Sequence, residues 1–302
     1  MDEIWKMDTI EDANRLLGVE TLHPMISVVD LSTLDSMKIG RKSFGVYSIF
    51  LKELDCGTVA YGRNKYDYQQ GTLIFIAPGQ IAGAEKREIK PNPKGWVLMF
   101  HPDLLYGTPL ARAMKNYHFF SYSSNEALHL SERERQIIIN GFKEIQEELQ
   151  HAIDKHSKQI LAANIEVILN HCERFYDRQF TTREIINHDL LSRFENLMLN
   201  YFKTDKPQTI GLPSVQYCAD QLHLSANYFS DLIKKETGKS AQEYIQTAII
   251  EQAKEILMEN NRTISEVAYD MGFKYPHHLS RMFKKVTGKT PNEYRAIQIP
   301  RL

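Results

Sequence analysis

The stretch "TISEVAYDMGFKYPHHLSRMFKKVTGKTPNEYR" (263–295) has a close variant upstream in the same chain, "SVQYCADQLHLSANYFSDLIKKETGKSAQEYI" (214–245). Apolar and small residues of the two copies match at an offset of 49 positions before a central turn and 50 after it. One extra residue inside "GFKYPHH" accounts for the difference. An internal repeat of this kind indicates one supersecondary unit that the chain uses twice.

Each copy has the pattern of a helix-turn-helix motif. A small residue in the first helix, Ala219 or Ala268, permits a close helix crossing. The turn falls at His223 and Gly272, a position that favours positive φ, where histidine is tolerable but strained. A glycine ends each second helix, as C-caps commonly do. These glycines are Gly238 and Gly288.

The segment between the copies, 241–261, lacks glycine and proline and carries an apolar stripe. It is therefore predicted to be one helix. Roughly 19 helical residues span about 28 Å, which is close to the roughly 34 Å turn of B-DNA. Such a strut can hold two second helices in successive major grooves on one face of a duplex.

Residues outside the predicted buried stripes of the second helices are the candidates for contacting DNA. Arg281 can contact guanine in bidentate fashion or clamp a phosphate, and Asn227 can read adenine. The lysine pairs are expected to neutralise phosphates. The full set expected to face DNA is Asn227, Tyr228, Asp231, Lys234, Lys235, Tyr275, His277, His278, Arg281, Lys284 and Lys285.

Residues 213–297 resemble the DNA-binding domain of AraC-type transcription regulators, and the second copy follows that family's signature almost from end to end. The resemblance implies two helix-turn-helix motifs that bind an asymmetric double-stranded DNA site, activation through RNA polymerase, and a homodimer. It also implies an N-terminal cupin-like domain that senses a small-molecule effector or mediates dimerisation. The family often has arginine where this chain has Asp231, so the first motif is expected to read differently or to contribute less affinity.

Composition sets the remaining bounds. The net charge is −1, but residues 203–302 carry 14 Lys and Arg against 11 Asp and Glu, while the remainder carries 23 against 27. Three scattered cysteines argue against a disulfide framework and against a zinc site, and favour a reducing cytoplasm. The start of the sequence does not resemble a signal peptide, and no apolar run is long enough to span a membrane. We therefore expect a cytoplasmic protein that associates with the bacterial nucleoid through DNA.

The predicted fold class is α+β. Short apolar runs at 44–54, 57–68, 71–80 and 95–103 predict a cupin-like antiparallel β-barrel, since turn residues bound each run. Helices are expected at 9–18 and through 111–203. The helices within 111–203 either pack on their own domain or form a dimer interface. The expected domains are 1–202 (sensor or dimerisation domain with its helical extension), 203–212 (linker) and 213–302 (DNA-binding domain, all α).

The N-terminal part offers few candidates for chemistry. A polar and aromatic run can line an effector pocket or form an exposed hairpin; its candidate contacts are Tyr61, Arg63, Lys65 and Tyr66. Residues 30–100 contain no histidine, and no P-loop, GxGxxG or GxSxG motif occurs. We therefore expect no catalytic site, metal or cofactor. The alternative is a metal-independent or thiol-dependent cupin-type enzyme fused to a DNA-binding tail, for which the N-terminal domain offers only Cys56. A further alternative is a DNA-binding regulator that responds to a protein partner.

Overall fold

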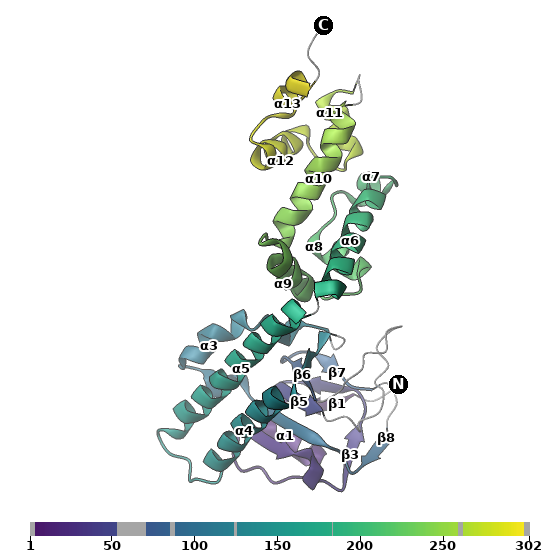
Figure 1. Ribbon diagram of the computed structural model, residues 1–302. Coiled ribbons are helices and arrows are strands. Elements are labelled where there is room, and N and C mark those ends of the chain that lie inside the picture. Colours follow the sequence, from purple (N-terminus) through teal and green to yellow (C-terminus); the bar gives the residue numbers. More distant parts are fainter. Residues whose placement is uncertain are drawn as a thin grey trace. The chain divides into compact units, whose positions relative to one another are not determined.

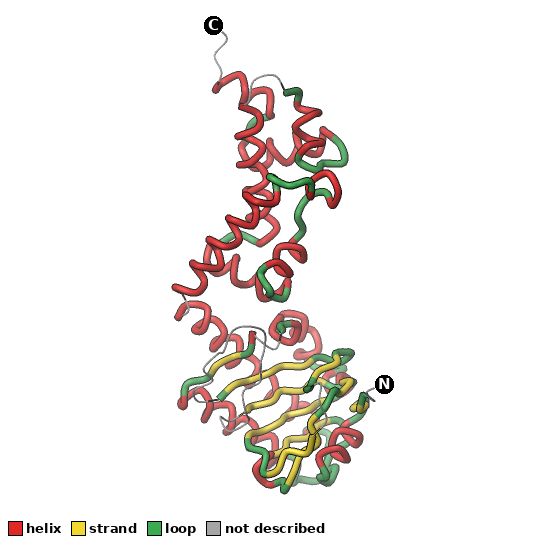
Figure 2. Tube along the Cα trace, turned by 90° about the vertical axis from the view of Figure 1, so that its right-hand side faces the viewer, coloured by secondary structure: helices red, strands yellow, loops and turns green. Residues whose placement is uncertain are grey.

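The protein divides into two compact units, Met1–Thr182 and Arg183–Leu302. The computed structural model describes residues 4–52, 71–84, 88–123, 126–182, 184–258 and 262–298 (Figure 1). Strands occur in the first unit, and the described part of the second unit is helical (Figure 2). The α+β class predicted from the sequence is therefore confirmed.

The first unit is built on a five-stranded antiparallel sheet of order β10-β6-β5-β9-β2. Three of the predicted apolar runs provide its centre, at 44–54, 71–80 and 95–103. The run at 57–68 lies outside the described residues. The strands are β2 (Ile26–Asp30), β5 (Tyr47–Lys52), β6 (Thr72–Ile76), β9 (Gly95–Phe100) and β10 (Leu128–His129).

Two smaller sheets complete the described strands. In one, β4 pairs in parallel with β1 and antiparallel with β7; in the other, β3 pairs antiparallel with β8. Their bounds are Trp5–Met7 (β1), Ser36–Ile39 (β3), Lys42–Phe44 (β4), Ile81–Ala82 (β7) and Glu88–Pro91 (β8). Among the described residues the sheets do not close on themselves, so the predicted cupin-like barrel is not confirmed.

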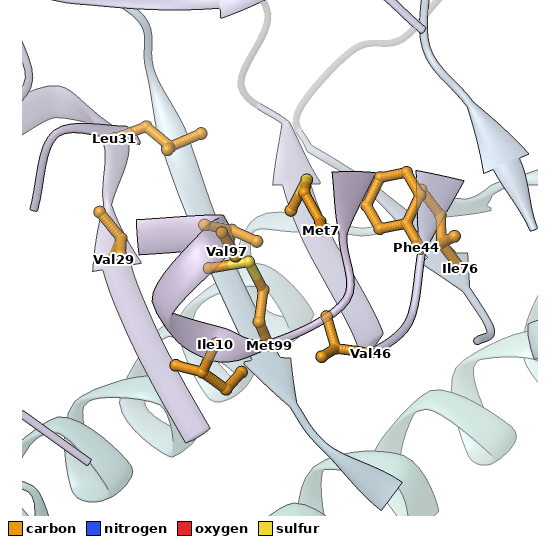
Figure 3. Packing of buried hydrophobic residues seen from close by; sticks show 10 residues of the cluster. Met7, Ile10, Val29, Leu31, Phe44, Val46, Ile76, Val97 and Met99 are labelled. Atoms are coloured by element: carbon orange, nitrogen blue, oxygen red, sulfur yellow. The ribbon is translucent and has the colours of Figure 1, made fainter. Parts of the chain in front are cut away.

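One face of the large sheet packs on helix α1 (Ile10–Leu17), and we call it the α1 face. Apolar side chains from α1, the β1-β4-β7 sheet and the large sheet form a common core there (Figure 3). Cap residues set the bounds of this helix, which the sequence predicts at 9–18: Thr9 and Asp12 form a capping box, and Gly18 adopts the left-handed conformation. This local prediction from the sequence is confirmed.

The opposite face of the large sheet is covered by helices α4 (Glu132–Glu148) and α5 (Ser157–Thr182), which pack against each other. The ring of Trp96 on β9 lies 6.4 Å from that of Phe142 on α4. A Cβ at Gly141 would lie 2.7 Å from Ile168, so glycine permits the close approach of the two helices. The connection that follows β9 forms four short helices: Pro102–Leu105 (α2), Pro109–Ala113 (α3), Met114–Asn116 (η2) and His118–Ser121 (η3). A further short helix, Leu31–Thr33 (η1), follows β2.

The second unit contains both copies of the repeat. The first copy forms α8 (Val215–Gln221) and α9 (Ala226–Thr237), and the second forms α11 (Ile264–Asp270) and α12 (Pro276–Thr287). Helix α10 (Ala241–Met258) joins them, and α13 (Pro291–Gln298) follows. Capping pairs form at the starts of α10, α11 and α13: Ser240 with Glu243, Thr263 with Glu266, and Thr290 with Glu293.

Helices α6 (Glu184–Tyr201) and α7 (Lys206–Ile210) precede the repeat and belong to the second unit. Helix α6 packs on α8, α9 and α10, with the ring of Phe194 5.6 Å from that of Phe229. The observed division thus lies after Thr182, whereas the sequence placed it at residue 202. The apolar stripe of α6 had suggested membership in the N-terminal domain, but the structure shows that this stripe covers the first motif.

The segment predicted as a linker, 203–212, contains α7 and is packed within the second unit. The Tyr201 hydroxyl donates a hydrogen bond to the Gly211 carbonyl oxygen at 2.7 Å, and Lys206 Nζ lies 3.1 Å from the Tyr217 hydroxyl. Helix α7 also contacts α11 of the second motif. The polar composition of the segment predicted an open chain. The contacts that stabilise it come from residues outside the segment, which its own composition does not reveal.

Candidate nucleic-acid interface

The second helix of each motif presents one apolar face to its unit and one polar face outward. Phe229, Leu232 and Ile233 on α9 are buried, as are Leu279 and Phe283 on α12. Gly238 and Gly288 end the two helices at φ 71° and 77°, so the second helices end in the same way. The repeat in the sequence therefore corresponds to a repeat in structure.

The turns of the two motifs use the same backbone conformation with different residues. His223 has a φ of 59° and Gly272 a φ of 83°, which confirms the prediction of positive φ at both positions. A Cβ at Gly272 would lie 2.3 Å from the Pro207 carbonyl oxygen of α7. The second turn therefore requires glycine for two reasons, its φ and the close approach of α7.

The outward face of α12 is basic and aromatic. His277, His278 and Arg281 are exposed, and Tyr275 at the N-cap position is 48% exposed. The rings of Tyr275 and His277 stack with centroids 5.5 Å apart, and that of His278 lies 4.3 Å from His277. These side chains form a cluster of hydrogen-bonding groups at the start of the helix, where helix-turn-helix proteins contact base edges.

Lys285 lies on the flank of α12 that faces the joining helix. Its Nζ donates a hydrogen bond to Oε1 of Gln246 on α10 at 3.3 Å. Hydrogen bonds from Ser240 chiefly hold the pKa of Glu243 below its usual range, and the charge of Lys285 contributes. Lys285 is therefore engaged by α10, whereas Lys284, the other member of the pair, is exposed next to it.

Helix α9 differs from α12 at two of the predicted positions. Asn227, Lys234 and Lys235 are exposed as expected. Tyr228 is only 5% exposed, so its side chain belongs to the buried face of α9 and the prediction that it faces DNA is corrected. Its counterpart in the repeat, His278, is exposed; the apolar stripe of α9 is thus wider than the sequence had indicated. Asp231 is half-buried.

Helix α10 sets the separation of the two outward faces. Its 18 residues span about 27 Å at the usual helical rise. Both α9 and α12 pack on α10, and Figure 1 shows α9 at its lower end and α12 beside it further up. The prediction of one continuous joining helix is confirmed.

Two exposed lysines at matched positions were missed by the sequence prediction. Lys239 and Lys289 each follow the glycine that ends a second helix, and both are exposed. The signal was present, since "TGK" occurs in both copies at 237–239 and 287–289. These lysines extend the positive charge at the C-terminal end of α9 and α12.

The described residues offer little support for the enzyme alternative. Burial raises the pKa of the Cys172 thiol, and it raises that of Cys218 to about 12, so these two cysteines are poor nucleophiles. Cys56 and the effector candidates Tyr61, Arg63, Lys65 and Tyr66 lie outside the described residues. Within the described ranges, no group of three or more His, Cys, Asp or Glu could hold a metal ion.

In the part of the chain that the structure describes, every helix is too short or too polar to cross a bilayer.

Comparison with known proteins places the repeat in a family. A family model described as a helix-turn-helix domain matches residues 218–297. The uncharacterized HTH-type transcriptional regulator YobQ of Bacillus subtilis is 34% identical over 113 residues, which are 33% of this chain and 46% of that protein. The bifunctional transcriptional activator and DNA repair enzyme AdaA of the same organism is 30% identical over 104 residues, 34% of this chain and 48% of that protein. The chain thus spans less than half the length of these relatives.

Among solved structures, the C-terminal domain of AraT, a response regulator from Geobacillus stearothermophilus, is 27% identical with a TM-score of 0.32. That match covers 37% of this chain and 88% of the AraT domain. The family match and the relatives fall on the residues that form the two motifs. Residues 218–297 are therefore a helix-turn-helix domain of the AraC type.

Proposed function

We propose that this protein is a sequence-specific DNA-binding transcription regulator in which α9 and α12 read neighbouring segments of the major groove. The observation that carries the proposal is the pair of equivalent second helices packed on the same joining helix, α10, each with a polar, lysine-bearing outward face. The AraC-type domain and the regulators to which the chain is similar support the same reading.

The residues proposed to contact DNA are divided by their chemistry. Arg281 and Asn227 read bases, because guanidinium and amide groups match guanine and adenine edges in the major groove. Lys234 and Lys284 bind phosphates, which gives affinity without sequence information. His277, His278 and Tyr275 contact bases or sugar-phosphate at the start of α12. Lys235 contacts phosphate, and Asp231 either accepts a hydrogen bond from cytosine or weakens the first motif.

We further propose that the first unit controls the second. It senses a small molecule or a protein partner, and it mediates homodimerisation through its sheets or through α4 and α5. Contact of the bound protein with RNA polymerase activates transcription, and the protein acts at the nucleoid in the bacterial cytoplasm. These proposals rest on the kinship of the DNA-binding domain.

The salt dependence of DNA affinity tests this function. Duplexes are first selected from a random pool with the full chain, and binding to the enriched sequence is then measured between low and high salt. Each phosphate contact contributes about −0.9 to the slope of log affinity against log salt concentration. We therefore expect Lys234→Ala and Lys284→Ala each to reduce that slope by about 1 and to weaken binding about equally for all sequences.

Lys158→Ala is the matched control, since Lys158 is an exposed lysine on α5 of the first unit. The slope should not change in this variant. Failure to enrich any sequence, or slopes unaffected by both substitutions in the second unit, would contradict the proposed function.

A further inference from the structure

Helix α7 connects the two helix-turn-helix motifs at a second place, apart from α10. On the side of the first motif, Nζ of Lys206 lies 3.1 Å from the Tyr217 hydroxyl on α8 and 5.7 Å from the centroid of the Tyr217 ring. On the side of the second motif, α7 contacts α11. We call residues 206–211, which are α7 and the glycine that ends it, the α7 brace.

The contact of the brace with the second motif is a close approach of two backbones. Pro207 is buried, and its carbonyl oxygen accepts a hydrogen bond from the Gly211 amide at 3.0 Å. A Cβ at Gly272 would lie 2.3 Å from the Pro207 carbonyl oxygen and 2.9 Å from the Gly211 carbonyl carbon. The turn of the second motif therefore packs directly on backbone atoms of the brace, which cannot move aside as the end of a flexible side chain can.

The end of the brace is also fixed to α6. Tyr201, the last residue of α6, is buried, and its hydroxyl donates a hydrogen bond to the Gly211 carbonyl oxygen at 2.7 Å. Its ring lies 5.2 Å from that of Tyr217 in an edge-to-face arrangement. Because α6 packs on α8 and α9, the brace is held by the elements of the first motif while it contacts the second.

A single joining helix determines the distance between two motifs more strictly than their mutual orientation. Long helices are rarely straight and curve over their length. A bend in α10 would tilt α12 relative to α9. A second connection beside α10, from α8 through α7 to α11, opposes such a bend because the two motifs are then joined at two separate places.

We infer that the α7 brace fixes the orientation of the second motif relative to the first and thereby determines which spacing of two half-sites the protein accepts. This inference deepens the proposed function and rests on it. One added base pair displaces a half-site by about 3.4 Å and rotates it by about 34°. A braced second motif cannot follow that movement, whereas an unbraced motif can follow it by bending α10.

Replacement of residues 206–210 by Gly-Ser-Gly-Ser-Gly tests this inference in the full chain. The segment keeps its length but becomes flexible and loses its contacts. Affinity is measured for the selected duplex and for the same duplex with one base pair inserted between the half-sites, which single base changes have mapped. The unmodified protein should lose at least about tenfold on insertion, comparable to one mismatched base pair. The variant should lose about threefold or less.

Tyr201→Phe is the milder variant, since it removes only the hydroxyl that holds Gly211. Its loss on insertion should lie between those of the unmodified protein and the Gly-Ser variant. Tyr106→Phe is the matched control, because Tyr106 follows α2 in the first unit and is 83% exposed. The control should behave as the unmodified protein. Retention of the full insertion loss in both brace variants would overturn the inference.

A distance measurement without DNA separates failure of this inference from failure of the proposed function. Spin labels are attached at Lys239→Cys and Lys289→Cys, beyond the ends of α9 and α12, with Cys56→Ser to remove the remaining thiol that is not buried in the described structure. The distribution of label distances should broaden in the Gly-Ser variant. An unchanged width with specific DNA binding would overturn the brace and leave the regulator. A broadened distribution in a protein that selects no duplex would support the brace and contradict the proposed function.

Discussion

Replacement of Arg281 by alanine is expected to weaken binding to the selected duplex by about 1–3 kcal/mol, or roughly 5- to 150-fold. Arg281 is exposed on α12, one turn beyond the ring cluster of Tyr275, His277 and His278. The planar fork of a guanidinium there can bond both O6 and N7 of a guanine. Competition binding against duplexes with single base changes measures the loss and shows which base pair it concerns.

Arg281→Lys separates base reading from phosphate contact. Lysine keeps the positive charge but lacks the planar fork of arginine. If Arg281 reads a base, this variant should retain affinity for random duplexes while losing discrimination at one position. If Arg281 only contacts phosphate, Arg281→Lys should behave as the unmodified protein. Unchanged specific affinity in Arg281→Ala would refute the assignment of α12 as a reading helix.

Gly272→Ala is expected to lower the free energy of unfolding of the second unit by about 2–5 kcal/mol. Forcing a side chain into the positive φ of this turn costs about 1–2 kcal/mol. The new Cβ would also lie 2.3 Å from the Pro207 carbonyl oxygen, and such overpacking costs typically about 1–3 kcal/mol more. Urea unfolding followed by far-UV circular dichroism measures the change.

Gly288→Ala is the matched control for this prediction. Gly288 has a φ of 77°, close to the 83° of Gly272, but a Cβ built on it has no neighbour within 4 Å. It should lose only the conformational part, about 1–2 kcal/mol. Equal losses in the two variants would contradict the packing of α7 on the second turn, and with it the inclusion of 203–212 in the DNA-binding unit.

The local features of the second unit were predictable from the sequence because their causes are local. The capping pairs, the glycines at the helix ends and the absence of glycine and proline from 241–258 determine where helices begin and end. The repeat made these signals stronger, since each was present twice. Even the strained turn at His223 could be anticipated from its alignment with Gly272.

The features that the sequence did not reveal depend on contacts between distant residues. The segment 203–212 looks polar and open, yet α7 is held by Tyr201 and Tyr217 and covers Gly272. The burial of Tyr228 follows from the packing of α9 rather than from its own amphipathic character. In the first unit the strands were predictable one by one, but their division among three sheets was not, because strand pairing is non-local.

Inserting five base pairs between the two halves of the selected duplex is the most direct measurement of the central claim. The half-turn rotates one half-site to the opposite face of the DNA. Because helix α10 holds the second motif in a fixed position relative to the first, the second motif cannot contact the rotated half-site. The account predicts that affinity falls to the level of a duplex with only one intact half-site. Affinity that is unchanged by the insertion would show that α9 and α12 do not read one duplex from a fixed separation, and would contradict the account.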